Sequence, residues 1–321
     1  MSHPPLRMVA FDLDGVVHRG ATLLPGAPEA LADVLRRGLL LRYVTNNSAQ
    51  HRSAVAARLA GFGLPAELEY ILTSGAATAD WLRERLEPKS RVMVMGGEGL
   101  VRELSEVGLD ARHAAVLPAA GAAATAAIAA AARTKSDATE AAPPRPDSMQ
   151  AEAAMMRALE SLALDPPAAM VVGIDRTFCY ETLALAQAAV MAGALFVATN
   201  TDATFPVEGR LLPGAGSLVA AVATAGGRQP VVIGKPEQEM AHRLAESAGV
   251  APQGVLFVGD RLDTDILWAR RAGMRSALVY SGVTQPSDVA RLEAAESVDE
   301  LPDFIMDDLR GLPSLLARLL G

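Results

Sequence analysis

The sequence has almost no cysteine: Cys179 is the only one in 321 residues. A disulfide within the chain and a metal cluster built on cysteines are therefore both excluded. No hydrophobic signal core precedes the first apolar stretch, and no apolar run approaches the roughly 20 residues that a membrane-spanning helix needs. These absences predict a cytoplasmic protein that has no membrane partner.

Basic residues are in the minority, with 29 Lys and Arg against 37 Asp and Glu, and the formal net charge is -8. This balance argues against nucleic acid as a partner. Half of the residues are hydrophobic and 21% are charged, which is typical of globular proteins. Because 321 residues exceed the roughly 250–300 at which a single core stops growing, we expect two domains.

Short apolar runs alternate with longer amphipathic stretches along most of the chain, which predicts an α/β fold with a doubly wound, mostly parallel sheet. The expected strands cover residues 7–13, 39–45, 91–95, 170–174, 195–199, 230–233, 254–258 and 276–279. The stretch 71–85 should hold a strand end and a helix. Further helices are expected at residues 25–37, 53–61, 181–192, 213–225, 237–248, 263–272 and 311–320.

Alanine dominates residues 118–150. The part 119–132 could be helical on propensity alone, but it has almost no large side chains to bury. Pro143, Pro144 and Pro146 then break any regular structure. We interpret the stretch as a poorly packed insertion in a loop, with a partner-binding segment as the alternative.

Polar residues stand directly after four of the expected strands. They are Asp12, Thr45, Lys235 and Asp260. In a doubly wound sheet, ligands bind beyond the carboxyl ends of the strands. We therefore expect these four side chains to converge on one crevice, although they are scattered over most of the chain.

Asp12 and Asp14 lie two residues apart, and Gly15 after them predicts a turn. A carboxylate can attack phosphorus and form a covalent acyl-phosphate. A second carboxylate can protonate the leaving oxygen and later deprotonate the hydrolytic water. Two adjacent negative charges beside a phosphate dianion need a cation, and Asp260 is a candidate further ligand for Mg²⁺.

The other strand ends offer donors for phosphate oxygens. Thr45 has a hydroxyl, Asn46 has a backbone N–H and an amide, and Lys235 has a point charge. Asp265, five residues after Asp260, falls near the first turn of a predicted helix and could orient Lys235 or a metal-bound water. Each signal is weak alone, since Asp-X-Asp at a strand end is more often a turn or a helix cap. Their common placement at strand ends favours phosphate chemistry.

Four motifs resemble those of haloacid-dehalogenase-like phosphatases: Phe11-Asp-Leu-Asp-Gly-Val-Val, Thr45-Asn-Asn, Gly234-Lys-Pro and Gly259-Asp-Arg-Leu-Asp-Thr-Asp-Ile266. The long gap between the second and third motifs is similar to that of the subgroup with a cap domain inserted there. The chain most resembles class IIA, the C2a-capped phosphatases, and the stretches 171–180, 198–206 and 213–217 support this. The resemblance covers nearly the whole chain except the alanine-rich insertion.

The resemblance implies that Asp12 is the nucleophile and a metal ligand. It implies that Asp14 is the acid/base and binds Mg²⁺ through its backbone carbonyl, and that Asp260 is the remaining protein ligand. It assigns phosphate binding to Thr45, Asn46, Asn47 and Lys235. The implied fold is a Rossmann-like core, residues 1–87 and 205–321, with an inserted α/β cap of the C2 type, residues 88–204.

The substrate implied by the resemblance is a small phosphomonoester, with phosphoglycolate or glycerol 3-phosphate favoured over a nucleotide, a sugar phosphate or pyridoxal phosphate. The cap loop that sets specificity would fall at Asp175, Arg176 and Thr177. Arg176 could meet a substrate carboxylate or be a solvated loop residue, and Arg52 could be a surface cation or a substrate clamp. Caps of this class often pair, so a homodimer is also implied.

Two rival functions remain open from the sequence. Hydrolytic dehalogenation uses the same scaffold, but it needs neither Mg²⁺ nor the proton donor that Asp14 provides. A non-catalytic sensor of phosphorylated ligands is the second rival, although such proteins usually lose a nucleophile or a metal ligand and none is missing here.

Overall fold

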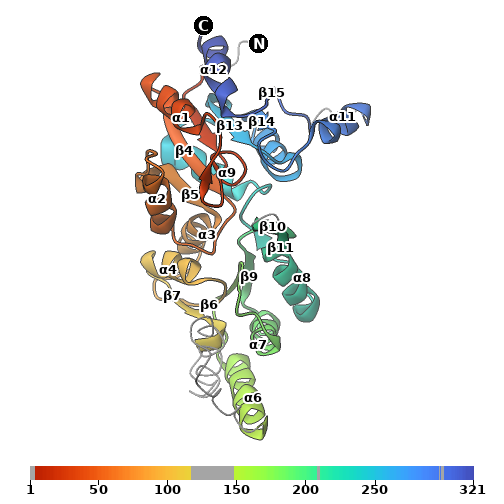
Figure 1. Cartoon of the computed structure of the whole chain (residues 1–321). Helices are drawn as coiled ribbons and strands as arrows, with labels where there is room; N and C mark the ends of the chain where they lie inside the picture. The colour runs from red at the N-terminus through yellow and green to blue at the C-terminus, as the bar shows by residue number, and fades with distance from the viewer. Residues whose placement is uncertain (1–3, 117–147, 208–209, 296, 298–299) are drawn as a thin grey trace, which may run out of the picture.

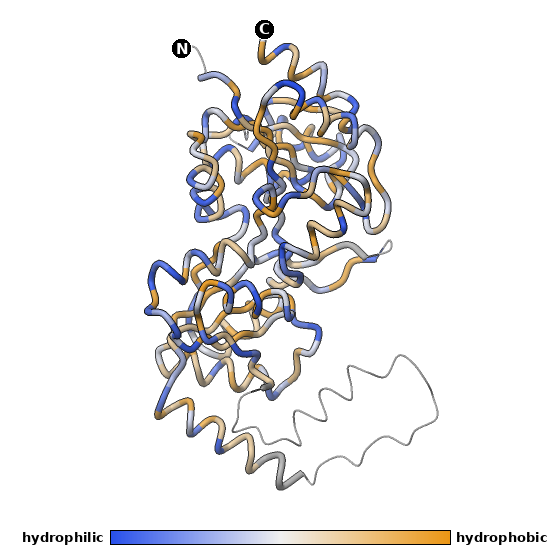
Figure 2. The backbone as a smooth tube through the Cα atoms, turned by 90° about the vertical axis from the view of Figure 1, so that its left-hand side faces the viewer, coloured by the Kyte–Doolittle hydropathy of each residue, from blue (hydrophilic) through white to orange (hydrophobic). Residues whose placement is uncertain are grey.

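The computed structural model describes residues 4–116, 148–207, 210–295, 297 and 300–321. Residues 118–147 of the alanine-rich insertion, including the helix considered for 119–132, lie outside this part. Figure 2 shows two lobes, and the C-terminus lies on the upper one, which is called the first lobe below. Among the described residues, no helix combines the length and the apolar character that crossing a membrane requires.

The first lobe is built on a six-stranded sheet in which every pair of neighbours is parallel. Its order is β15 (Phe304–Met306), β14 (Arg275–Val279), β13 (Val255–Gly259), β1 (Met8–Phe11), β4 (Leu40–Thr45) and β5 (Ile71–Thr73). Every residue of β1 is buried, as expected for a central strand covered on both faces.

Side chains of β1 alternate between two hydrophobic cores, one on each face of the sheet. Val9 and Phe11 pack with α1 (Ala27–Arg36), α2 (Arg52–Gly61) and α12 (Leu312–Leu320). Met8 and Ala10 pack with helices of the opposite face, α3 (Ser74–Arg83), α9 (Glu239–Ala248) and α10 (Leu267–Arg271). The sheet is therefore doubly wound, as the sequence predicts (Figure 1).

The second lobe has a five-stranded parallel sheet. Its order is β12 (Val231–Val232), β9 (Leu195–Ala198), β8 (Ala169–Val172), β6 (Arg91–Met95) and β7 (Asp110–His113). One face packs against α6 (Ser148–Leu164), α7 (Tyr180–Met191) and α8 (Ala215–Gly226). The other face packs against α3 and against α4 (Glu98–Glu106), so α3 contributes to the packing of both sheets.

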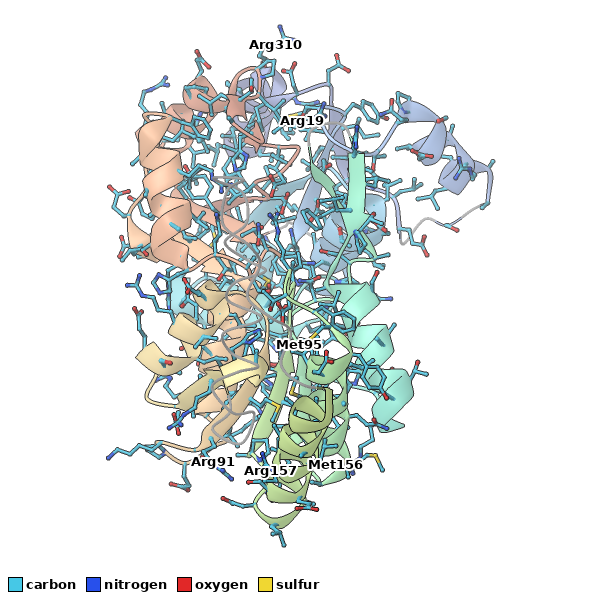
Figure 3. All side chains as sticks on the ribbon, turned by 60° about the horizontal axis from the view of Figure 1, so that its bottom comes forward. Arg19, Arg91, Met95, Met156, Arg157 and Arg310 are labelled. Atoms are coloured by element: carbon cyan, nitrogen blue, oxygen red, sulfur yellow. The ribbon has the colours of Figure 1, made fainter. Side chains whose placement is uncertain are left out.

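An inserted α/β lobe on a mostly parallel core confirms the predicted fold class. The proposed cap range, 88–204, stays a prediction. The second sheet extends beyond it, because β12 pairs with β9 and α8 packs on α7. In Figure 3, Arg91 and Arg157 lie at the far end of the second lobe and Arg310 lies at the opposite end of the molecule.

Several elements were not predicted. They are α4, β7, α6, α11 (Pro286–Ala294), β15, the short pair β2 (His18–Arg19) and β3 (Thr22–Leu23), and the hairpin β10 (Thr204–Val207) and β11 (Arg210–Pro213). The helix expected at residues 263–272 begins instead with a π-helical turn, Leu262–Ile266, before α10.

Candidate active site

The carboxyl ends of both sheets face one cleft of about 1890 Å³. From the first lobe, Asp12 follows β1, Thr45 ends β4 and Asp260 follows β13, and all three line the cleft. The second lobe contributes residues that follow β6, β8 and β9. Lys235 also lies there, but it reaches the cleft after β12, a strand of the second sheet. The expected convergence is present, although it joins two sheets and not one.

Lys235 is the electrostatic centre of the site, and its side chain is only 2% exposed. Its Nζ donates to Oδ1 of Asp12 and to Oδ1 of Asp265, each at 2.7 Å. Burial disfavours the ammonium, but the two carboxylates outweigh burial and hold the pKa of Lys235 above its ordinary value. Lys235 is therefore a fixed cation beside Asp12.

Asp12 and Asp260 are buried carboxyl groups. Burial raises the pKa of Asp12 well above its ordinary value; Lys235 opposes this shift, and Asp265 and Asp260 add to it. Burial, and then repulsion from Asp265, raises the pKa of Asp260 to about 7. If all three carboxyl groups ionise, one ammonium leaves the cluster two negative charges in excess, so a divalent cation fits it.

The carboxylate of Asp260 packs against the backbone of two glycines, Gly15 and Gly282. The N–H of Val283 donates to its Oδ2 at 2.7 Å. A Cβ at Gly15, whose φ is +91°, would lie 2.6 Å from the same oxygen, and a Cβ at Gly282 would overlap it. Glycine at these two positions lets the turn after β1 and the loop after β14 enclose Asp260.

Asp265 also lines the cleft, but its side chain is only 2% exposed. Its Oδ2 accepts from the backbone N–H groups of Asp260 and Arg261, at 3.0 and 3.1 Å. Its Oδ1 accepts from Lys235. With both oxygens engaged, Asp265 fixes Lys235 and the end of β13 in one arrangement. Asp12, Asp260 and Asp265 bring carboxylate oxygens within 4.8 Å of one another.

Asp14 lies at the mouth of the cleft, with its side chain 48% exposed. Nδ1 of His18 lies 3.6 Å from its Oδ1. The turn at Gly15 directs Asp12 inward and leaves Asp14 free to meet solvent or a ligand. This difference in exposure suits different tasks for the two carboxylates.

The loop after β4 places its three predicted residues differently. Oγ1 of Thr45 accepts from the N–H of Asn47 at 3.1 Å, so its hydroxyl hydrogen is left to donate. The amide of Asn46 is used structurally: it donates to Asp202 and to the carbonyl of Lys235, and it accepts from the N–H of Lys235 at 2.8 Å. Its side chain therefore anchors Lys235 and does not face the cleft as a free donor.

Sequence reasoning missed Asp202 and Arg261, which both line the cleft. Asp202 accepts from Asn46 at 3.1 Å, and burial raises the pKa of its carboxyl group. Arg261 pairs with Asp263 at 3.0 Å. Their placement after predicted strands could have identified them, because Asp202 stands shortly after the predicted strand 195–199 and Arg261 stands next to Asp260.

The three predicted cap residues also line the cleft. Asp175 is buried, and one of its oxygens accepts from His113 while the other accepts from Thr177. Arg176 is exposed. Arg52 is not a clamp, because its guanidinium pairs with the fully buried Glu103 of α4 at 2.7 Å. That pair joins the two lobes.

Comparisons with known proteins identify the family of this chain. A model of haloacid dehalogenase-like hydrolases matches residues 9–110, and a HAD-hydrolase-like model matches residues 232–312. Human glycerol-3-phosphate phosphatase is 34% identical over 316 residues, which cover 94% of this chain and 88% of the relative. The chain belongs to the haloacid dehalogenase-like hydrolases. Within that family it is a phosphatase.

Solved structures of phosphatases share the whole fold. The p-nitrophenyl phosphatase from Archaeoglobus fulgidus has a TM-score of 0.75 at 25% identity, covering 97% of this chain and all of that one. A glycerol phosphate phosphatase from Mycobacterium tuberculosis, solved in complex with magnesium, has a TM-score of 0.72 at 32% identity, covering 96% of this chain and 76% of that one.

Proposed function

We propose that the chain is a Mg²⁺-dependent hydrolase of a small phosphomonoester, with Asp12 as the nucleophile. The observation that carries this proposal is the arrangement around Lys235, which holds Asp12 on one side and Asp265 on the other while Asp260 lies beside them. One carboxylate is thereby oriented beside a fixed cation, and the excess of buried negative charge favours binding of a divalent metal. An oriented nucleophile and nearby cations are what attack on a phosphate requires.

A Mg²⁺ ion would be held by Asp12, Asp260 and the backbone carbonyl of Asp14, an all-oxygen donor set that suits this ion. When bound, the ion would offset the buried negative charge and polarise the phosphate. Lys235, held by Asp265, would neutralise the phosphate from the opposite side. The Thr45 hydroxyl and the backbone N–H of Asn46 would donate to the phosphate oxygens, whereas the N–H of Asn47 donates to Oγ1 of Thr45.

The chain's own groups then divide the reaction into two steps. In the first, a carboxylate oxygen of Asp12 bonds to phosphorus, the ester P–O bond breaks, and Asp14 gives its proton to the leaving oxygen. In the second, Asp14 takes a proton from water as that water attacks phosphorus, and inorganic phosphate leaves Asp12 as a free carboxylate. The exposure of Asp14 agrees with this role, because it must reach both the leaving group and solvent.

We favour phosphoglycolate or glycerol 3-phosphate as the substrate. The names of the human and mycobacterial relatives support a glycerol phosphate. Arginines of the cleft wall such as Arg176 and Arg210 could meet a second anionic group such as the carboxylate of phosphoglycolate, whereas Arg112 already pairs with Asp110. The cleft volume of about 1890 Å³ also leaves room for a nucleotide, a sugar phosphate or pyridoxal phosphate.

A phosphate-release screen over these five classes with Mg²⁺ tests the proposal and ranks the substrates. Turnover should stop with EDTA and return with added Mg²⁺. Chloride release from a 2-haloacid without metal would support dehalogenation instead, and binding of phosphorylated ligands without any phosphate release would support a sensor. A homodimer formed through the cap is a further prediction of the family resemblance, and a cytoplasmic location is a further prediction of the sequence.

A further inference from the structure

His113 connects the edge of the second sheet to the turn that forms the cap wall of the cleft. It is the last residue of β7, and its side chain is 18% exposed. Its Nε2 lies 2.8 Å from Oδ2 of Asp175, which is 62 residues away in sequence. Both residues line the same cleft as Asp12 and Lys235.

The second ring nitrogen of His113 fixes its tautomer. The backbone N–H of Ala115 donates to Nδ1 at 3.1 Å, so Nδ1 must be without a proton. Nε2 then carries the hydrogen and donates it to Asp175. A proton on Nδ1 would set two N–H groups against each other, so the arrangement has a defined direction from Ala115 through His113 to Asp175.

Asp175 is the hub of the turn, because its two oxygens are fully used. Oδ2 accepts from His113, while Oδ1 accepts from the N–H of Thr177 at 2.8 Å and from its hydroxyl at 2.6 Å. The side chain is only 3% exposed. A buried carboxylate that lost a donor would be costly, so the turn would rearrange if His113 could not donate.

Arg176 is the member of this turn that remains available to a ligand. It stands between the two bonded residues, is exposed, and lines the cleft. We propose that His113 is a positioning residue that holds Asp175, and through it the turn 175–177, so that Arg176 meets the part of the substrate beyond the phosphate. This inference rests on the proposed function, and it favours a phosphomonoester with a second anionic group.

The test measures phosphate and substrate recognition separately. His113→Leu should raise KM for phosphoglycolate about tenfold, the effect of about one lost hydrogen bond to a charged group, while changing kcat little. Inhibition by inorganic phosphate should be unchanged, because phosphate contacts only the core groups. His113→Gln should restore KM, since its amide can still donate to Asp175.

A second set of variants reverses the direction of the hydrogen bond. Asp175→Asn should raise KM as His113→Leu does, because two donors then face each other. In the double variant His113→Gln/Asp175→Asn, KM should return to near the wild-type value, since the glutamine oxygen can accept from the asparagine amide. His242→Leu, at an exposed position of α9, is the matched control and should behave as wild type.

Calorimetric binding to variants that also carry Asp12→Asn makes the test independent of turnover. His113→Leu should weaken phosphoglycolate about tenfold and leave inorganic phosphate unchanged. Equal weakening of both ligands would show a merely structural role and overturn the inference, as would no change for either. A wild-type chain that binds phosphoglycolate in this manner but hydrolyses no phosphomonoester would overturn the proposed function alone.

Discussion

Replacement of Asp12 by Asn tests the nucleophile without changing the shape of the site. The amide cannot form an acyl-phosphate, so phosphate release should fall by about 10⁴-fold or more, as for the loss of other enzyme nucleophiles. That factor corresponds to about 5 kcal/mol of activation free energy.

The same substitution should leave the fold intact, for reasons visible around Lys235. The asparagine oxygen can still accept the hydrogen bond that Lys235 donates at 2.7 Å, and Asp265 still pairs with the ammonium. Repulsion between Asp12 and the neighbouring Asp260 and Asp265 disappears. We therefore expect the free energy of unfolding to change by no more than about 1 kcal/mol, or to rise.

Phosphate release with saturating Mg²⁺ and urea denaturation give the two measurements. Rapid acid quenching of wild type during turnover should show a phosphorylated chain by mass spectrometry, and the variant should show none. Asp33→Asn is a matched control: Asp33 is a buried carboxylate on α1 that pairs with Arg37 at 2.6 Å, outside the cleft. Full activity of the Asp12→Asn enzyme would refute the assignment of the nucleophile.

Three further predictions follow from the charges of the site and of the contact between the lobes. The pKa of Asp260 is raised to about 7, so without metal this group contributes stability at acid pH that is lost as the pH rises through 7, whereas Mg²⁺ needs the ionised form. The thermal stabilisation by Mg²⁺ should therefore shrink between pH 8 and pH 6 and vanish in Asp260→Asn; equal stabilisation at both pH values would contradict this. Lys235→Met leaves Asp12 beside other buried carboxylates without a cation, so kcat should fall about 10²- to 10³-fold, and the variant should unfold at a lower temperature at pH 8 than at pH 5. Arg52→Met removes the guanidinium that pairs with the fully buried Glu103, which keeps the backbone N–H of residue 52 at 2.8 Å and the ring of His51 at 3.5 Å, and should cost about 3 kcal/mol in urea denaturation. Glu103→Gln leaves Arg52, whose side chain is 28% exposed, and should cost about 1–2 kcal/mol. The reverse order of these two costs would show that Glu103 does not depend on Arg52.

Most of the first sheet could be predicted from local sequence. Strands such as β1, β4 and β13 are short apolar runs that end at polar residues, and burial on both faces imposes that pattern. The edge strand β15 was missed because it is three residues long and only partly buried. The amphipathic helix α4 was missed although its buried Leu100 and Leu104 are four residues apart.

The strand-end rule found Asp12, Thr45, Lys235 and Asp260, yet it explained Lys235 by the wrong sheet. The local sequence of an apolar run does not indicate which sheet the strand will join. Pairing of β12 with β9 depends on hydrogen bonds between segments about 30 residues apart, and these exist only in the folded chain.

The partners of the polar side chains were likewise beyond the sequence. Asn46 has a side-chain amide that could donate to phosphate, but in the fold this amide forms hydrogen bonds with Asp202 and Lys235. Arg52 has the charge of a clamp, but it lies beside Glu103. Whether two groups form a hydrogen bond or an ion pair depends on differences in distance of about an ångström. Residue type and spacing in the sequence do not determine such distances.

The sequence by itself determined that the chain carries two carboxylates after a buried strand, a lysine, and a third carboxylate after another strand. Those residue types restrict the chemistry, because few reactions need two carboxylates and a cation together. The tertiary structure decided which carboxylate is buried beside Lys235 and which one meets solvent. It also decided that His113, unmarked in the sequence, lies 2.8 Å from Asp175 at the opposite wall of the same cleft. Chemistry follows from residue type, but specificity follows from distances between residues far apart in the chain, and only folding sets those distances.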